Sequence, residues 1–408
     1  MTVDAPATSP WPFDDFVDIA TAFAAMDPPL IEGSAGPTIR LGDQDLVNFA
    51  GINFLDVEAI GGVRENFAAA VERHGLVTGG SRMSQGIMRP HWDLERELCR
   101  ITGKERAITF ASGMLANLGF ANALTHHMRM ETGIQIDFRD VAFVLDRDSH
   151  WSLWKAVEHL EYGKKLFAFR HNDAADLENI LRRMRGRRTV VAMESVYSTD
   201  GTVAPMGDLI DVCEKYGALS FVDDANGFMV YGPPHRPFAA EFEAMRRATF
   251  VMVSFSKSVG LEGGAIAGPA GAILAFELLS GTSMFTAAMQ PPTASAATHV
   301  LSMLDSQPAI VDDYLSRVQR FRSALSDIGC QLNESGTYIT SVRVGVDGTA
   351  YELRERFLEL GYQVPVFSYP AVRRNNAVLR LLLNAGHTDD QLAAFVDTLA
   401  GLKRSCGF

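Results

Sequence analysis

Between about Ala107 and Gly268, short β-branched and aromatic runs alternate with amphipathic helical patterns. This alternation is typical of βαβ units whose strands form a mainly parallel sheet. Helical patterns begin near His91 and Met206, where apolar residues recur at intervals of three and four and a glycine follows the end. The predicted strands are Ala107–Phe110, Val141–Leu145, Leu166–Phe169, Thr189–Met193, Leu219–Val222 and Thr249–Val253, with Ala265–Ala267 as a further candidate.

The pattern changes after Pro291 and Pro292, where a long helical stretch runs to about Asp327. A strand-like segment from Tyr338, a helical segment from Glu352 and a last helix from about Asp389 follow. We therefore expect an α/β fold with three parts: an N-terminal segment (1–45), a large domain with a mainly parallel sheet (46–290) and a smaller C-terminal α+β domain (291–408).

The composition favours a soluble protein that acts on small molecules. Hydrophobic residues make up 47% and charged residues 21% of the 408-residue chain, as in ordinary globular proteins. The formal net charge of -12 disfavours sequence-independent binding to nucleic acid or to an anionic membrane. We therefore expect small-molecule substrates and neither of those two partners.

Several features predict a cytoplasmic location. The four cysteines lie far apart, without the density of a disulfide framework or the spacing of a metal site. The first residues carry acidic groups where a signal peptide needs basic ones. The most apolar stretch, from Gly263, is interrupted by Pro269 and Glu277 and so fails as a membrane span.

The ends of two predicted strands carry residues suited to pyridoxal 5'-phosphate (PLP) chemistry. Ligands of open parallel sheets bind beyond the carboxyl ends of the strands. The strand LSFVD ends on Asp223, and VMVSFSK places Ser254 and Lys257 just after another strand. A lysine can bond PLP as a Schiff base, while a carboxylate keeps the pyridine nitrogen protonated. The alternatives are that Asp223 caps a helix and that Lys257 is a solvated surface charge. The segment around Lys257 is rich in Ser and Gly and lacks helical periodicity, which argues against a solvated helix face.

Other strand ends supply weaker candidates. Ser112 and Gly113 open a helix whose N–H groups could bind a phosphate, although glycine at such a turn is common for conformational reasons alone. His150 could stack on a flat ring or be structural. Ser198 could donate to the cofactor's phenolic oxygen or simply belong to a turn before Asp200. Ser254 could bind the phosphate.

Nine segments extend this set along most of the chain, and they are GLVTGGSRMSQG from Gly75, HWDLE from His91, FASGMLAN from Phe110, DSHWS from Asp148, FRHNDAADLE from Phe169, ESVYSTDGTVAPM from Glu194, VDDANG from Val222, SFSK ending at Lys257 and VLRLLLNAGHT from Val378. In this order they resemble the α-oxoamine synthase family of fold-type-I PLP-dependent transferases. Members of this family condense an amino acid with an acyl thioester. The ending FSYPAVRRNNAVLRLLLN is most similar to the branch that makes long-chain autoinducer ketones.

The resemblance implies a role for each matching residue. Lys257 matches the Schiff-base lysine and the base that removes the α-proton, and Asp223 matches the partner of the ring nitrogen. His150 matches the histidine that stacks on the ring, and Ser198 the partner of the phenolic oxygen. The remaining matches are Ser112, Gly113 and Met114 at the phosphate, Arg380 at the substrate carboxylate, and Arg82 as a weaker candidate for a substrate contact, for which a plain surface or interface arginine is the alternative.

Three departures from the family pattern affect the substrate more than the cofactor. Asn226 stands where the family has a histidine near the phenolic oxygen, and an amide can donate a hydrogen bond but cannot take up and carry a proton as an imidazole does. Ile52 replaces a substrate-contacting asparagine, and a second arginine is replaced around Ser368. Glycine is therefore not assumed to be the substrate.

The predicted function is the decarboxylative condensation of an α-amino acid with an acyl group bound to CoA or to a carrier protein, giving an α-amino ketone. The family implies a homodimer with its sites at the subunit interface. The alternatives are transamination or decarboxylation on the same scaffold, and a non-catalytic PLP-fold binding protein.

Overall fold

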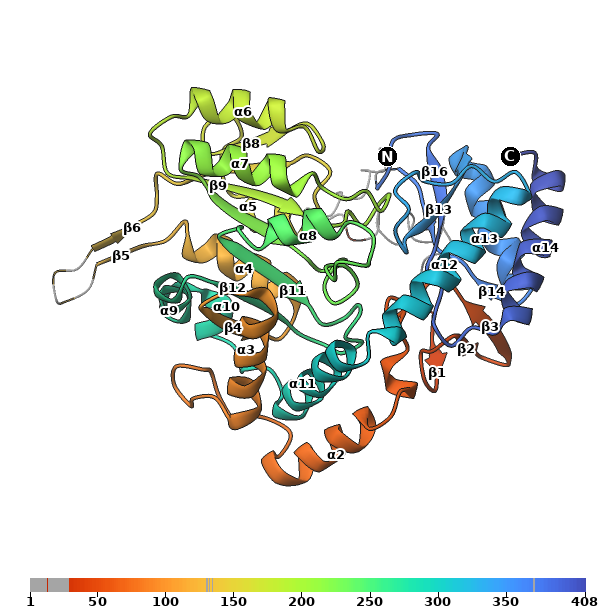
Figure 1. Ribbon diagram of the computed structural model, residues 1–408, viewed down its shortest axis with the longest axis horizontal. Coiled ribbons are helices and arrows are strands. Elements are labelled where there is room, and N and C mark those ends of the chain that lie inside the picture. The colour runs from red at the N-terminus through yellow and green to blue at the C-terminus, as the bar shows by residue number, and fades with distance from the viewer. Residues whose placement is uncertain (1–12, 14–28, 130, 132, 134, 370) are drawn as a thin grey trace, which may run out of the picture.

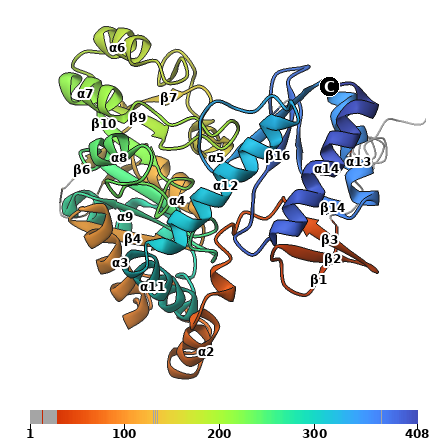
Figure 2. The same cartoon turned by 45° about the vertical axis from the view of Figure 1, so that its right-hand side comes forward.

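A computed structural model describes residues 13, 29–129, 131, 133, 135–369 and 371–408 of the chain. Residues 1–12 and 14–28, which include the acidic start used to predict the absence of an export signal, lie outside the described residues. Figure 1 shows a larger lobe around a β-sheet and a smaller lobe that carries the C-terminus. In Figure 2 the helix α12 (Ala309–Asp327) crosses between them.

The larger lobe is built on a seven-stranded sheet in the order β4-β12-β11-β10-β9-β7-β8. Every predicted strand is confirmed to within one or two residues. The sheet is parallel except at β12, which pairs antiparallel with both β11 and β4. Its strands are β4 (Arg106–Phe110), β7 (Ala142–Asp146), β8 (Leu166–Phe169), β9 (Thr189–Glu194), β10 (Leu219–Asp223), β11 (Phe250–Ser254) and β12 (Gly264–Gly268).

Both faces of this sheet are buried, because neighbouring residues along a strand contribute to two different apolar cores. On β10, for example, Phe221 belongs to one core and Val222 to the other. The core that contains Phe221 is covered by α4 (Gly113–Ala123), α5 (Trp151–Val157) and α9 (Ala270–Leu279). The core that contains Val222 is covered by α3 (Arg89–Thr102), α6 (Ala174–Arg183), α7 (Met206–Tyr216), α8 (Ala239–Met245) and α11 (Pro291–Ser306).

The helical stretch predicted after Pro291 consists of two helices, α11 and α12, which are separated at Gln307 and Pro308. Proline disfavours helical geometry in the residue before it, which explains the break. Although α11 follows the predicted domain boundary at residue 290, it packs against α3 and against α2 (Val63–His74) of the larger lobe.

The smaller lobe contains two sheets. One has the order β13-β16-β15 and is antiparallel. The other joins β1, β2 and β3 to β14, so residues 31–48 pair with the C-terminal part, and β3 crosses the predicted boundary at residue 45. The elements are β1 (Ile31–Glu32), β2 (Thr38–Leu41), β3 (Gln44–Asn48), β13 (Thr340–Gly345), α13 (Asp347–Glu359), β14 (Tyr362–Gln363), β15 (Val366–Phe367), β16 (Ala377–Leu381) and α14 (Asp389–Cys406).

Short elements complete the described chain, and they are the 3-10 turn η1 (Val57–Ala59), the hairpin of β5 (His127–Arg129) and β6 (Gln135–Asp137), and α10 (Gly281–Met284). Among the described residues, no helix has the length and apolar character that a membrane span needs.

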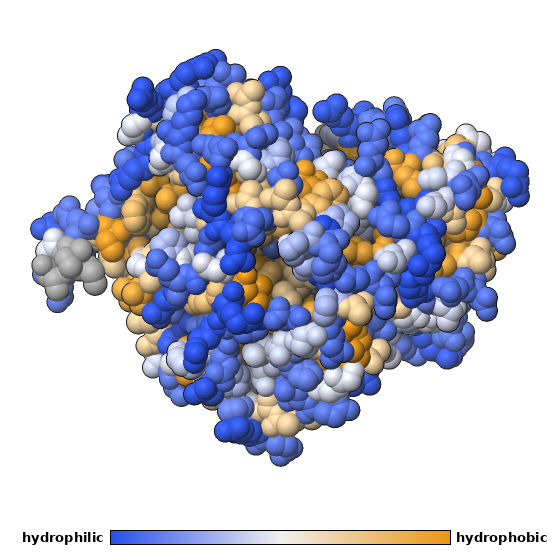
Figure 3. Space-filling model, in the orientation of Figure 1, coloured by the Kyte–Doolittle hydropathy of each residue, from blue (hydrophilic) through white to orange (hydrophobic). Residues whose placement is uncertain are grey.

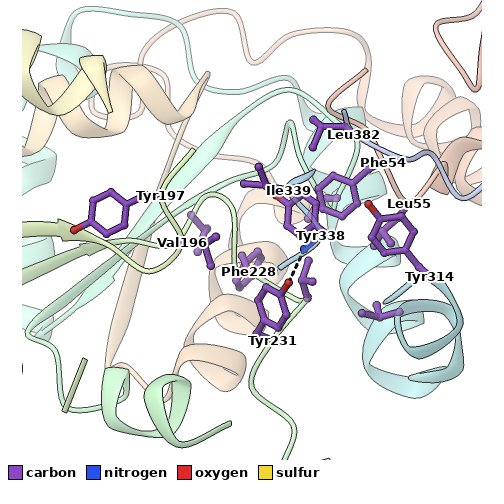
Figure 4. Packing of buried hydrophobic residues seen from close by; sticks show 14 of the residues in the cluster. Phe54, Leu55, Val196, Tyr197, Phe228, Tyr231, Tyr314, Tyr338, Ile339 and Leu382 are labelled. Atoms are coloured by element: carbon purple, nitrogen blue, oxygen red, sulfur yellow. Dashed lines mark hydrogen bonds between the residues drawn. The ribbon is translucent and has the colours of Figure 1, made fainter. Parts of the chain in front are cut away.

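A buried aromatic cluster joins the two lobes (Figure 4), and the hydroxyl of Tyr338 in this cluster donates to Asn226, which follows β10. The ring centroids of Phe54 and Tyr338 are 4.2 Å apart, and those of Phe54 and Tyr314 are 5.3 Å apart. The backbone N–H of Tyr338 donates to the hydroxyl of Tyr231 across the junction at 3.0 Å. Because these side chains are almost fully buried, they fix the smaller lobe against the strand ends of the larger one.

Candidate active site

Two adjacent carboxyl groups at the end of β10 face different surroundings. The carboxylate of Asp223 accepts hydrogen bonds from Asn117 Nδ2 at 2.9 Å and from the backbone N–H of Ala225 at 3.0 Å. Asp224 instead accepts from Ser195 Oγ at 2.5 Å. Burial raises the pKa of both. The different partners confirm that the two side chains alternate across the strand, as expected from its pleat.

Lys257 lies in the turn after β11, where its carbonyl accepts from the N–H of Gly260 at 3.0 Å. Burial, and then the positive charge of Arg380, lower the pKa of its amine to about 8, although the charges of Asp223 and Glu194 oppose this. A substantial fraction of the amine is therefore neutral near physiological pH, which suits a nucleophile or a base.

His150 caps the start of α5 and lies near Lys257, Asp223 and Arg380, since the charges of these three residues shift its pKa. Burial is the largest effect, and it lowers the pKa of His150, so the ring is neutral at pH 7. Its Nδ1 is 2.8 Å from Ser152 Oγ, and its backbone N–H donates to the carboxylate of Glu194. The imidazole is thus held in one orientation.

The N-terminus of α4 contacts the end of β11. A Cβ atom placed on Gly113 would lie 3.0 Å from Ser254 Cβ and 3.1 Å from its Oγ, so any larger residue would push Ser254 away from the start of the helix. Ser112 caps the helix by accepting from Leu115 N at 3.2 Å. The N–H groups of Gly113 and Met114 belong to the first turn, where a helix provides no acceptor. Together with the hydroxyl of Ser254, they form a candidate phosphate site.

Asn226 is held by two hydrogen bonds. Its Nδ2 donates to the carbonyl of Val196 at 3.1 Å, and its Oδ1 accepts from the hydroxyl of Tyr338 at 3.3 Å. These bonds orient the amide and leave its second N–H proton available. Ser198 lies half-buried in the turn that follows Val196.

Arg380 is a buried cation with unused donors. The residue is only 8% exposed, and within the described part of the chain its Nε and Nη2 have no hydrogen-bond partner. Its guanidinium lies over the ring of Phe367, 5.2 Å from the centroid, and burial lowers its pKa. Because an unpaired buried charge is costly, this arrangement favours an anionic ligand. Ser368 and Ile52 are positions where the sequence departs from the family pattern. Ser368 Oγ lies 2.7 Å from the hydroxyl of Tyr351, and the side chain of Ile52 is partly exposed, with the residue at 37%.

Arg82 does not join this group, and its interpretation as a surface or interface arginine is wrong for this chain. The residue is 7% exposed. Its guanidinium donates to both carboxylate oxygens of Glu277, at 2.7 and 2.9 Å, and to Glu95 at 2.7 Å. Since two carboxylates already hold the guanidinium, we correct the predicted substrate contact to a structural role.

Three residues at the site were not predicted. Glu194 ends β9 and binds the backbone of His150, so inspection of every strand end would have found it. Burial, and then the charge of Asp223, raise its pKa. Asn117 lies four residues after Gly113, one helical turn further along the same face of α4. Tyr338 comes from the smaller lobe, and no local pattern connects it with Asn226.

These residues fit PLP. The two hydrogen-bond donors to Asp223 are neutral, and its buried carboxylate forms no salt bridge among the described residues, so a protonated pyridine nitrogen could pair with it directly. Ser254 and the first turn of α4 would hold the phosphate, and Lys257 would bond the cofactor. When bound, PLP supplies an electron sink for a carbanion at the substrate's α-carbon. The described residues include no cluster of His, Cys, Asp and Glu able to hold a metal ion.

The fold and the site define the chain as a fold-type-I PLP-dependent enzyme. It belongs to the aminotransferase class I and II family, whose model matches residues 51–399. The 8-amino-7-oxononanoate synthase of Alkaliphilus metalliredigens is 29% identical over 374 residues, which cover 90% of each chain. The serine palmitoyltransferase of Sphingomonas wittichii has a TM-score of 0.86 and 26% identity over 98% of this chain and 99% of that one. A structure of SPT with PLP has a TM-score of 0.87 and 25% identity, and the match covers 97% of this chain and 98% of that one.

These similarities confirm the predicted α-oxoamine synthase group, the PLP-dependent transferase fold and the cofactor. They also confirm the reaction class, a decarboxylative condensation of an amino acid with an acyl thioester, and they do not favour the aminotransferase alternative.

Proposed function

We propose that this enzyme binds an α-amino acid through Arg380 and transfers to its α-carbon an acyl group from CoA or from a carrier protein. The buried guanidinium of Arg380, with two unused nitrogen donors and its charge close enough to lower the pKa of Lys257, is the observation that carries this proposal. A substrate carboxylate would pair with it in a bidentate manner and place the α-carbon near the lysine amine.

Each neighbouring side chain has a proposed task. The amine of Lys257 accepts the α-proton, which it can do because burial lowers its pKa to about 8 and leaves part of the amine neutral near pH 7. Asp223 would hold the positive charge of the cofactor ring, and His150 would contact its face. The carbanion forms a C–C bond with the thioester carbonyl, the thiolate leaves, the carboxylate is lost as carbon dioxide, and the α-carbon takes up a proton to give the amino ketone.

A product assay with single variants tests the proposal. The holoenzyme is mixed with a panel of amino acids and acyl-CoAs of several chain lengths, and free thiol, carbon dioxide and ketone are measured. We expect thiol and carbon dioxide in equal amounts, only when both substrates are present. Arg380→Leu should raise the KM for the amino acid at least tenfold, because a charge-assisted bond contributes roughly 1.5–3 kcal/mol. Formation of a keto acid without the release of free thiol would contradict the proposal.

We also propose a cytoplasmic homodimer. All four cysteines are free thiols, which suits a reducing compartment. Large apolar side chains are exposed on one segment, with Leu76 at 60%, Val77 at 59% and Met83 at 47%, and Phe285 at 85% follows on a second segment. The two segments are adjacent, since the N–H of Ala288 donates to the carbonyl of Gly80.

Exposed apolar groups of this kind are typical of an interface. The face of the molecule seen in Figure 3 is mostly hydrophilic and carries scattered apolar patches. Sedimentation of Phe285→Asp should show more monomer than the unmodified enzyme. An unmodified chain that sediments as a monomer would refute the dimer.

A further inference from the structure

A buried carboxylate at the end of β7 organises the loop that leads to His150. Asp146 is fully buried, and its Oδ1 accepts from the backbone N–H of Asp148 at 2.9 Å. Its Oδ2 accepts from the backbone N–H of Asn172, after β8, at 2.8 Å. Burial opposes the ionised form, but the surrounding donors prevail and lower the pKa of Asp146, so this group is a carboxylate at neutral pH.

His171 connects this carboxylate to the turn that carries Ser198. Its Nδ1 lies 3.0 Å from Asp146 Oδ1, and its Nε2 lies 2.8 Å from Thr202 Oγ1. The turn is closed by its own backbone, since the N–H of Tyr197 donates to the carbonyl of Thr202 at 2.9 Å. The imidazole therefore links the strand end before His150 to the turn that contains Ser198.

The directions of these hydrogen bonds determine the protonation of His171. The hydroxyl of Thr202 has one proton, and it donates that proton to Asp200 Oδ1 at 2.8 Å. Thr202 Oγ1 is therefore an acceptor for His171 Nε2; Asn172 Nδ2, which lies 3.1 Å from the same nitrogen, can donate instead to the carbonyl of Val203 at 3.4 Å. Because the ionised Asp146 can only accept, Nδ1 must also carry a proton. With Asn172 Nδ2 bonded to Val203, the ring donates from both nitrogens and is an imidazolium.

The electrostatic surroundings agree with this assignment. Burial lowers the pKa of His171, but the hydrogen bond and the charge of Asp146, with smaller contributions from Asp148 and Asp200, outweigh burial and raise it. The other titratable neighbour is Tyr197, whose ring meets the imidazole edge-on with centroids 4.4 Å apart.

The same turn is fixed from the opposite side by the smaller lobe. Thr337 Oγ1 donates to the carbonyl of Gly201 at 3.0 Å, and Asn333 Nδ2 donates to the carbonyl of Asp200 at 2.6 Å. Without His171 the turn would keep these contacts and the bond from Asn172 Nδ2 to Val203, but it would lose its direct link through the imidazole to Asp146. Ser198 would then be held less firmly relative to His150.

We propose that His171 is a positioning residue that, as an imidazolium between Asp146 and Thr202, fixes the loops carrying His150 and Ser198 for cofactor binding. This inference rests on the proposed cofactor contacts of those two residues, while the protonation state of His171 can be measured independently of any activity. Neither the resemblance nor the comparisons assign a role to His171.

The test uses the full-length enzyme and three variants. His171→Gln removes the cation, and Thr202→Val removes the acceptor of Nε2 but retains the pair with Asp146. His235→Gln is a matched control, because His235 also pairs with an aspartate, Asp312, at 3.0 Å, but on the surface. Nitrogen-15 NMR of labelled histidine reports the protonation of the ring, and equilibrium dialysis gives the PLP dissociation constant.

We expect the His171 signal, assigned by its absence from His171→Gln, to show two protonated nitrogens at pH 7. PLP binding should weaken roughly tenfold or more in His171→Gln and in Thr202→Val, from the charge-assisted bond that both remove. The double variant should be no worse than His171→Gln, since both changes break one link, and His235→Gln should bind PLP normally. If Thr202→Val folds but His171→Gln does not, the affinity of Thr202→Val for PLP tests the proposal by itself. A neutral His171 ring, or unchanged PLP affinity in Thr202→Val, would overturn the proposal.

Discussion

Removal of Arg82 tests the structural role that we assign to this residue. Its guanidinium donates to both oxygens of Glu277 and to Glu95, and its side chain is 4% exposed. In Arg82→Leu, Glu95 keeps donors from Thr109, at 2.9 and 3.0 Å, whereas Glu277 loses both bonds to Arg82. Breaking a buried ion pair from one side costs about 3–5 kcal/mol.

The protonation of a carboxylate sets an independent limit on this cost. A glutamate with an ordinary pKa of about 4.3 can be protonated at pH 7 for about 3.7 kcal/mol, because each pH unit corresponds to about 1.36 kcal/mol. At pH 5 the same step costs about 1 kcal/mol. Because protonation removes the unpaired charge left by Arg82→Leu, the loss of stability should be large at pH 7 and smaller by about 2–3 kcal/mol at pH 5.

Urea unfolding of Arg82→Leu at both pH values measures these losses. Glu277→Gln in the same background should recover part of the stability at pH 7, because it removes the unpaired charge. The KM for the amino acid should stay close to that of the unmodified enzyme. Normal stability together with a raised KM would refute the structural role and restore the predicted substrate contact.

Three further predictions concern the cofactor site. Lys257→Ala should give no peptide labelled with PLP after borohydride reduction, and in the apo-protein the attachment of PLP should become faster as pH rises through about 8, because only the neutral amine reacts; a label on another lysine would contradict this. Asp223→Asn should lower the rate of α-proton exchange by orders of magnitude, whereas Asp224→Asn should change little, because Asp224 bonds Ser195 on the other side of the strand; the reverse result would mean that the assigned strand register is wrong by one residue. Asn226→Ala should reduce kcat/KM by roughly tenfold or less, and Tyr338→Phe should act in the same direction, since a neutral hydrogen bond contributes about 0.5–1.5 kcal/mol; an abolished reaction would reveal another role.

The strands of the larger sheet could be predicted because both of its faces are buried. A strand such as Phe250–Ser254 then reads as a continuous apolar run bounded by polar residues. The antiparallel direction of β12 could not be predicted, since a short apolar run has no direction. The placement of β1 to β3 beside β14 also depends on a pairing across most of the chain.

The site was predictable where chemistry follows directly from position on a strand. Asp223 ends one buried strand and Lys257 follows another, and the ends of these strands meet at one edge of the sheet. The partners of Arg82 could not be predicted, because Glu277 is 195 residues away in sequence. The same holds for Asn226 and Tyr338, which are 112 residues apart and belong to different lobes. Sequence patterns identify which side chains are polar and buried, but the identity of their partners depends on the tertiary fold.

The buried charges of the site explain how substrate binding can prepare the base. After burial itself, the charge of Arg380 is the largest influence that lowers the pKa of Lys257. A substrate carboxylate bound to Arg380 would cancel this charge, while Asp223 and Glu194 would continue to favour a protonated lysine. The proton affinity of the free amine would therefore increase with the amino acid in place. In the proposed reaction, Lys257 would be a weaker base in the empty site, where a neutral amine is needed to bond the cofactor, and a stronger base when the α-proton is removed.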